Sequence, residues 1–169
     1  MSHGARTVQD AREAFRSCLS PQFYDQWAET YETDHDQMQY MAPTHTAEAV
    51  KRHLQPIPEQ QRVLDVACGS GLVAKMLSSL GFRCFVGVDS SAAMLEEAQK
   101  TKLYQSLHLA LLGTQDLPVG SEQFDVVTIV GALYPGFVPV KVVRELCAAA
   151  TPGTTIKLLL STNSHHSYV

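Results

Sequence analysis

The stretch Val63-Leu64-Asp65-Val66-Ala67-Cys68-Gly69-Ser70-Gly71 decides the fold, because it joins a mainly apolar strand to a glycine-rich turn. Residues 62–66 have the length of a strand, and residues 72–80 have the apolar spacing of a helix. Glycines in such a turn let a ligand approach the backbone, and the next helix presents unpaired N–H groups. The stretch therefore predicts a strand, a ligand-binding loop and a helix in succession.

The same alternation of short apolar runs and helical patterns continues to residue 160. It predicts further strands over residues 84–88, 107–112, 124–130 and 154–160, with helices over residues 91–101 and 138–150. Apolar strands that alternate with helices form parallel units buried on both faces, with right-handed crossovers. We therefore predict an α/β fold: a Rossmann-like, doubly wound, mostly parallel sheet.

Residues 1–60 show no strand pattern and predict an N-terminal helical lid on a domain formed by residues 61–169. The expected helices of the lid cover residues 7–19, 21–33 and 44–55. Tyr24, Trp27 and Tyr31 are spaced three and four apart, so they share one helix face. That face either packs on the edge of the sheet or covers a cofactor, whose positive charge aromatic rings attract.

The composition limits the classes of partner. The chain has 169 residues, 45% of them hydrophobic, and a net charge of −4 without a basic block, so nucleic acid is not suggested as a partner. We expect no membrane span and no apolar signal segment, which points to a cytoplasmic or nuclear location. The four cysteines are too widely spaced to predict a zinc site or a disulfide framework.

Asp65 distinguishes between two ligands that the glycine turn can hold. The segment Gly69–Ala74 fits the G-x-G-x-x-A pattern of dinucleotide-binding proteins. A pyrophosphate is repelled by a carboxylate at the end of the strand, whereas S-adenosylmethionine presents an ammonium and a sulfonium group. Asp65 therefore favours S-adenosylmethionine, whose carboxylate the loop N–H groups would hold. An NAD-dependent oxidoreductase remains a remote alternative.

Asp89 provides the second expected contact with the cofactor. It ends the second strand, where its carboxylate can accept hydrogen bonds from both ribose hydroxyls. Ser90 is assigned to the same site, and both Ser90 and Ser91 can cap the following helix. Met94 on that helix either faces the adenine or packs in the core.

These residues resemble the ordered motifs of the class I S-adenosylmethionine-dependent methyltransferases. The motifs are Val63–Leu72, Gly87–Ser91, Asp116–Pro118 and Phe124–Val127. A closer resemblance, to the Williams–Beuren syndrome chromosome region methyltransferase-like proteins, lies in Phe23–Ala28, Asp65–Gly69 and Ile129–Leu133. The resemblance implies that Asp65, Gly69 and Gly71 bind the methionine end, that Asp89 binds the ribose and Met94 the adenine, and that Val130 lines the reacting end.

The chain departs from the general motif at two positions. Ala67 stands where glycine is usual, and we count it with the cofactor-binding residues. Gly113 stands where many class I enzymes have an acidic residue for the adenine amino group, so the Thr114 backbone, Gln115 or Asp116 would have to take that role. Methyl transfer requires correct placement of an activated methyl group, so we predict no catalytic side chain and no metal.

Class I domains usually continue past the fifth strand with a helix and a reversed hairpin, whereas this chain ends nine residues after Leu160. We therefore expect a C-terminally shortened form without that hairpin, and the resemblance then implies five strands in the order 3-2-1-4-5. Its fifth strand would be an exposed edge through which copies of the chain could self-associate. The expected function is methyl transfer to a small molecule or a protein, and the alternative is a cofactor-binding protein with weak catalysis.

Overall fold

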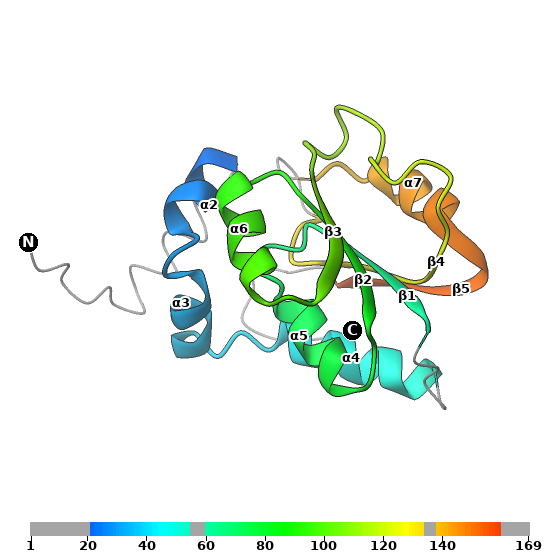
Figure 1. Ribbon diagram of the computed structural model, residues 1–169, viewed down its shortest axis with the longest axis horizontal. Coiled ribbons are helices and arrows are strands. Elements are labelled where there is room, and N and C mark those ends of the chain that lie inside the picture. The colour runs from blue at the N-terminus through cyan, green and yellow to red at the C-terminus, as the bar shows by residue number, and fades with distance from the viewer. Residues whose placement is uncertain (1–20, 55–59, 134–137, 160–169) are drawn as a thin grey trace, which may run out of the picture.

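A computed structural model describes residues 21–54, 60–133 and 138–159, and its centre is a five-stranded sheet in the order β3-β2-β1-β4-β5 (Figure 1). Every pair of neighbouring strands is parallel. The predicted fold class and strand order are therefore confirmed. The strands are β1 (Arg62–Val66), β2 (Cys84–Asp89), β3 (Tyr104–Leu109), β4 (Phe124–Val130) and β5 (Ala150–Leu159).

Helices cover both faces of the sheet. The helices α4 (Ala42–His53) and α5 (Leu72–Ser79) lie on one face, and α7 (Val142–Ala149) lies on the other (Figure 1). Within β1, Val63 packs in the cluster with α4 and α5, and Leu64 packs in the cluster with α7. Successive side chains of a strand point to opposite faces, so Asp65 lies on the side of α4 and α5.

The N-terminal helices α2 (Pro21–Trp27) and α3 (Tyr31–Gln37) replace the single helix expected over residues 21–33, which was wrong. Asp34 explains the break, because its Oδ2 accepts hydrogen bonds from Trp27 Nε1 at 2.5 Å and from Thr30 Oγ1 at 3.1 Å. These bonds hold the turn between the two helices. The helix expected over residues 7–19 lies outside the described residues.

Two hydrogen bonds dock α2 on the start of α6 (Ala92–Lys100), and the two helices lie side by side in Figure 1. Asp25 Oδ1 accepts a hydrogen bond from Ser91 Oγ at 2.5 Å and one from the Ala93 N–H at 3.2 Å. Of the two serines expected to cap α6, Ser91 is the N-cap, because its hydroxyl accepts a hydrogen bond from the Met94 N–H. The N-terminal helices thus lie beside the ends of the strands that carry the expected site.

Three expected boundaries were wrong by several residues. The third strand covers residues 104–109, because Tyr104 already pairs with Phe85 of β2. The last helix begins at Val142, after a turn in which the Val142 N–H donates to the Pro139 carbonyl. The fifth strand begins at Ala150 and contains Pro152 and Gly153 within an irregular pairing with β4.

The expected bounds of the first and fourth strands are confirmed, and α4 begins two residues earlier than expected. Among the described residues, no helix is both long and apolar enough to cross a membrane. The expected absence of a reversed hairpin concerns residues 160–169, which lie outside the described part of the chain.

Candidate functional site

The loop after β1 has the backbone geometry that its glycines predict. Ala67, Gly69 and Gly71 have φ angles of 55°, 54° and 93°, all in the left-handed region that favours glycine. At Ala67 this geometry costs about 1 kcal/mol, because the β-carbon crowds the backbone. The Cys68 N–H donates to the Val88 carbonyl at 3.1 Å and keeps the loop beside the end of β2.

Asp89 braces this loop from the end of β2. Its Oδ2 accepts a hydrogen bond from the Gly69 N–H at 2.8 Å, and its Oδ1 accepts one from the Ser91 N–H at 2.9 Å. Burial raises the pKa of Asp89 above its ordinary value, although the backbone hydrogen bonds oppose that shift. A carboxylate offers about four acceptor positions, so Asp89 can still accept a hydrogen bond from a ligand hydroxyl.

A cleft opens next to Asp89, at the carboxyl ends of the first three strands. This is where open α/β sheets bind their ligands. Ala67, Asp89 and Ser90 of the predicted site contribute to its wall. The lining residues are Pro21, Ala67, Asp89, Ser90, Leu111, Leu112 and Val138.

Asp65 lies beneath the loop, with 1% of its surface exposed, and is not among the residues that line the cleft. Its Oδ2 accepts a hydrogen bond from the Tyr104 hydroxyl at 2.8 Å, and its Oδ1 accepts one from Thr128 Oγ1 at 3.0 Å. Burial raises the pKa of Asp65 to about 6, against the opposing effect of these two hydrogen bonds. A carboxylate so poorly solvated is stabilised by a nearby cation.

Ser70 is a candidate ligand contact that the sequence analysis missed. Its side chain is 1% exposed, and among the described residues its hydroxyl has no hydrogen-bond partner. It lies one residue before Gly71, the N-cap of α5, whose first N–H groups have no partner within the helix. The position of Ser70 in the turn between a strand and a helix is the feature of the sequence from which it could have been predicted as a ligand contact.

These groups fit S-adenosylmethionine. The unpartnered Ser70 hydroxyl and the N–H groups at the start of α5 suit its carboxylate, and the buried Asp65 carboxylate suits its ammonium group. Asp89 suits the ribose hydroxyls, because it faces the cleft with acceptor capacity remaining.

The three aromatic residues predicted to share a face are brought together beside the loop. The ring centroids of Trp27 and Tyr31 lie 4.9 Å apart, and those of Tyr24 and Tyr31 lie 6.4 Å apart. Tyr31 approaches the loop itself, because a β-carbon added at Gly69 would lie 3.9 Å from its hydroxyl. Trp27 is 1% exposed and supports the cluster from inside. The role of this cluster as a cover for the cofactor stays a prediction.

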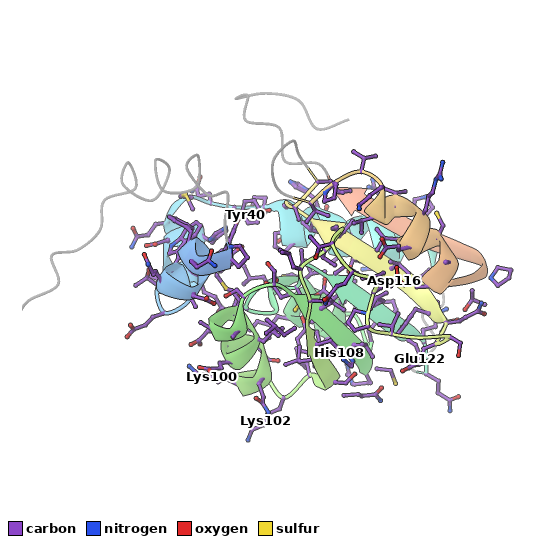
Figure 2. All side chains as sticks on the ribbon, turned by 90° about the horizontal axis from the view of Figure 1, so that it is seen from above. Tyr40, Lys100, Lys102, His108, Asp116 and Glu122 are labelled. Carbon is purple, nitrogen blue, oxygen red and sulfur yellow. The ribbon has the colours of Figure 1, made fainter. Side chains whose placement is uncertain are left out.

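Tyr40 extends this aromatic group to the end of β4, and the sequence analysis missed it. Figure 2 shows Tyr40 between the N-terminal helices and the sheet. A β-carbon added at Gly131 would lie 2.5 Å from the Tyr40 hydroxyl, so the glycine makes room for that ring. The His35 ring lies between the rings of Tyr31 and Tyr40, with centroid distances of 4.0 and 4.7 Å. Burial lowers the pKa of His35, which keeps its imidazole neutral.

Three other predicted residues lie away from the cleft wall. Met94 is fully buried, and Val130 is half-buried against the cluster of α4 and α5. Thr114 is exposed, and its hydroxyl donates to the Leu111 carbonyl at 2.7 Å. Leu111 and Leu112 line the cleft instead. The two leucines were not predicted as site residues, because they were expected to lie inside the third strand.

Comparison with known sequences adds the following findings. Residues 63–153 match the methyltransferase domain family. Human methyltransferase-like protein 27 is 44% identical over 142 residues, which are 84% of this chain and 58% of that protein. The tRNA U34 carboxymethyltransferase of Hahella chejuensis is 34% identical over 112 residues, 64% of this chain and 34% of that enzyme. The chain thus spans well under two thirds of the length of these relatives.

Two solved structures resemble the fold. A complex of DhpI with SAH has a TM-score of 0.62 at 24% identity and covers 96% of this chain and 72% of that one. A complex of the Haloferax volcanii Trm112 methyltransferase activator with a putative methyltransferase has a TM-score of 0.64 at 22% identity, with coverages of 80% and 58%. At these identities the likeness concerns the fold alone.

Proposed function

This chain belongs to the S-adenosylmethionine-dependent methyltransferases, and from that premise we propose that it binds S-adenosylmethionine at the cleft beside Asp89 and methylates a small molecule or a protein. The observation that carries the proposal is the Asp89 carboxylate, which hydrogen-bonds the Gly69 N–H and lines the cleft. Membership of this family decides against the nicotinamide alternative.

The chain's own residues have to bind S-adenosylmethionine and orient it toward the acceptor. When bound, S-adenosylmethionine supplies a methyl group that its sulfonium already activates, so the protein needs no nucleophile of its own. Asp65 attracts the ammonium, Ser70 and the start of α5 hold the carboxylate, and Asp89 holds the ribose. Ala67, Ser90 and the two leucines of the cleft wall complete the surface around the adenosyl part.

The acceptor would enter from the aromatic side of the site. Tyr31, His35 and Tyr40 run from the glycine loop to Gly131 at the end of β4, and His35 is neutral. Rings without a formal charge suit a small molecule or a protein side chain better than a phosphate backbone. We therefore do not extend the tRNA substrate named for one relative to this chain, whose net charge is −4.

Two features support the remaining parts of the proposal. β5 is the last strand in the order of the sheet, and an edge strand can pair with a second copy of the chain, which supports the self-association that we propose. Three of the four cysteines lie in the described part of the chain, and all three are free thiols. Free thiols favour a reducing compartment, in line with the proposed cytoplasmic or nuclear location.

Thermal-shift titrations with S-adenosylmethionine, S-adenosylhomocysteine and NAD test the proposal. We expect both adenosyl ligands to raise the melting temperature of the wild type and NAD to leave it unchanged. Asp89→Ala should lose this response, whereas Glu96→Ala, an exposed acidic position on α6 and a matched control for charge, should keep it. Stabilisation by NAD alone would refute the proposal. Binding without methyl transfer to any acceptor would support the alternative of a weak catalyst.

A further inference from the structure

The Tyr104 side chain crosses a strand to reach Asp65. Tyr104 begins β3 and Asp65 lies on β1, yet the Tyr104 hydroxyl donates to Asp65 Oδ2 at 2.8 Å across the intervening β2. Two glycines make room for the ring. A β-carbon at Gly87 would lie 2.8 Å from Tyr104 Cε1, and one at Gly71 would lie 3.2 Å from Cε2. The ring is thus held between β2 and the start of α5.

Thr128 holds the same carboxylate from the other side. It pairs with Asp65 in the register of β1 and β4, and its hydroxyl lies 3.0 Å from Asp65 Oδ1. The same hydroxyl lies 3.3 Å from the Leu64 carbonyl, which makes the carboxylate its nearer acceptor. Each oxygen of Asp65 therefore has one hydroxyl donor, and the two donors come from strands on opposite sides of β1.

The charge of this carboxylate has no counterion among the described residues. The titratable groups that face Asp65 are Tyr104 from β3, Cys68 from the loop and Asp89 from the end of β2. Burial raises the pKa of both the Tyr104 hydroxyl and the Cys68 thiol, so these groups stay neutral. Asp89 is acidic and also disfavours charge on Asp65. A ligand that brings an ammonium group would supply the missing positive charge.

We propose that Tyr104 is a positioning residue for the methyl donor: with Thr128 it orients the Asp65 carboxylate, which binds the donor's ammonium group in its ionised form. The inference rests on the proposed function. At a pH where the free protein holds Asp65 protonated, one neutral carboxyl and one ammonium become an ion pair and one proton that is released to solvent. Where the carboxyl is already ionised, no proton is released.

This arrangement makes cofactor binding depend on pH in a defined direction. Burial holds the pKa of Asp65 at about 6 in the free protein, so below that pH the donor must first displace a proton. The affinity should fall by about tenfold between pH 7.5 and pH 5. Removal of the Tyr104 hydroxyl takes away a hydrogen bond that lowers the pKa of Asp65. The midpoint of the pH profile should then rise by about one pH unit.

Calorimetric titration of S-adenosylhomocysteine into the full chain between pH 5 and pH 8 tests this inference. Tyr104→Phe keeps the ring between the two glycines and removes only the hydroxyl. Ser106→Ala is the matched control on the same strand, because the Ser106 hydroxyl is hydrogen-bonded to His108 rather than to Asp65. Titration in two buffers of different ionisation enthalpy measures the released proton directly. We expect the midpoint to rise in Tyr104→Phe and to stay at the wild-type value in Ser106→Ala.

A purely structural role of Tyr104 would weaken binding by the same factor at every pH, and that result would overturn the inference. Thr128→Val removes the second donor and should raise the midpoint in the same direction, which provides an independent test if Tyr104→Phe does not fold. Binding that is independent of pH in the wild type overturns this inference alone. No binding of the ligand at any pH overturns the proposed function as well.

Discussion

Replacement of Asp65 by asparagine should make the protein more stable at neutral pH. Asn has the shape of Asp, and its amide can accept a hydrogen bond from one of the two neighbouring hydroxyls while it donates to the other. The hydrogen bonds with Tyr104 and Thr128 can therefore be kept. What disappears is the cost of a negative charge in a site that is 1% exposed.

The pKa values set the size of this effect. The Asp65 pKa is about 6 in the folded protein against an ordinary value of 3.8, and the difference corresponds to about 3 kcal/mol. A raised pKa means that the folded state binds more protons between these two values. The contribution to stability is therefore fully present below pH 3.8 and is lost as the pH rises through 6. Between pH 4.5 and pH 7.5 the wild type should lose about 2 kcal/mol from this group.

Urea unfolding at a series of pH values measures the effect as a difference between variant and wild type. The difference in free energy of unfolding, Asp65→Asn minus wild type, should increase by about 2 kcal/mol from pH 4.5 to pH 7.5. The exposed Asp116→Asn controls for the change in net charge (Figure 2). A difference that stays constant over this range, or a wild type that becomes relatively more stable as the pH rises, would refute the reasoning.

Three further substitutions test the packing around the site. Gly87→Ala should lower the free energy of unfolding by about 2 kcal/mol in urea titrations, because its β-carbon would lie 2.6 Å from Leu107 Cδ2 and 2.8 Å from Tyr104 Cε1. An unchanged free energy of unfolding would contradict that geometry. Ala67→Gly should raise the melting temperature by relieving a φ of 55°, with a net gain of about 0.5 kcal/mol, and a loss of stability would count against the strain. Asp34→Ala should lower the free energy of unfolding by about 2 kcal/mol, because the indole N–H of Trp27 loses its acceptor. The fluorescence of Trp27, the single tryptophan, should change as well, and an unaltered emission spectrum would contradict this role of Asp34.

Most of the fold followed from local patterns. The bounds of β1 and β4 were predicted correctly, and the N-cap of α6 is one of the two serines that were expected to cap it, because apolar period and capping chemistry act within a few residues. The helix expected over residues 21–33 failed for the opposite reason. Its break depends on the bonds from the Asp34 carboxylate to the Trp27 indole and Thr30, and helical periodicity does not reveal these contacts.

The candidate site also contains some features that local sequence predicts and others that depend on tertiary contacts. The left-handed turns at Gly69 and Gly71 and the position of Asp89 at the end of β2 were predictable, since turn chemistry and strand order place them. The wall formed by Leu111 and Leu112 was not, because it depends on where β3 ends.

The sequence by itself determined the succession of strands and helices, the glycine loop and the acidic residue before it, because these follow from hydrophobic period and turn chemistry. The strand order was implied by the resemblance to the class I methyltransferases. Only the tertiary structure decided what surrounds Asp65. Its two hydrogen-bond donors come from Tyr104 and Thr128, 39 and 63 residues away along the chain. Their choice depends on strand register and on the space above Gly87, which no local pattern of residues specifies.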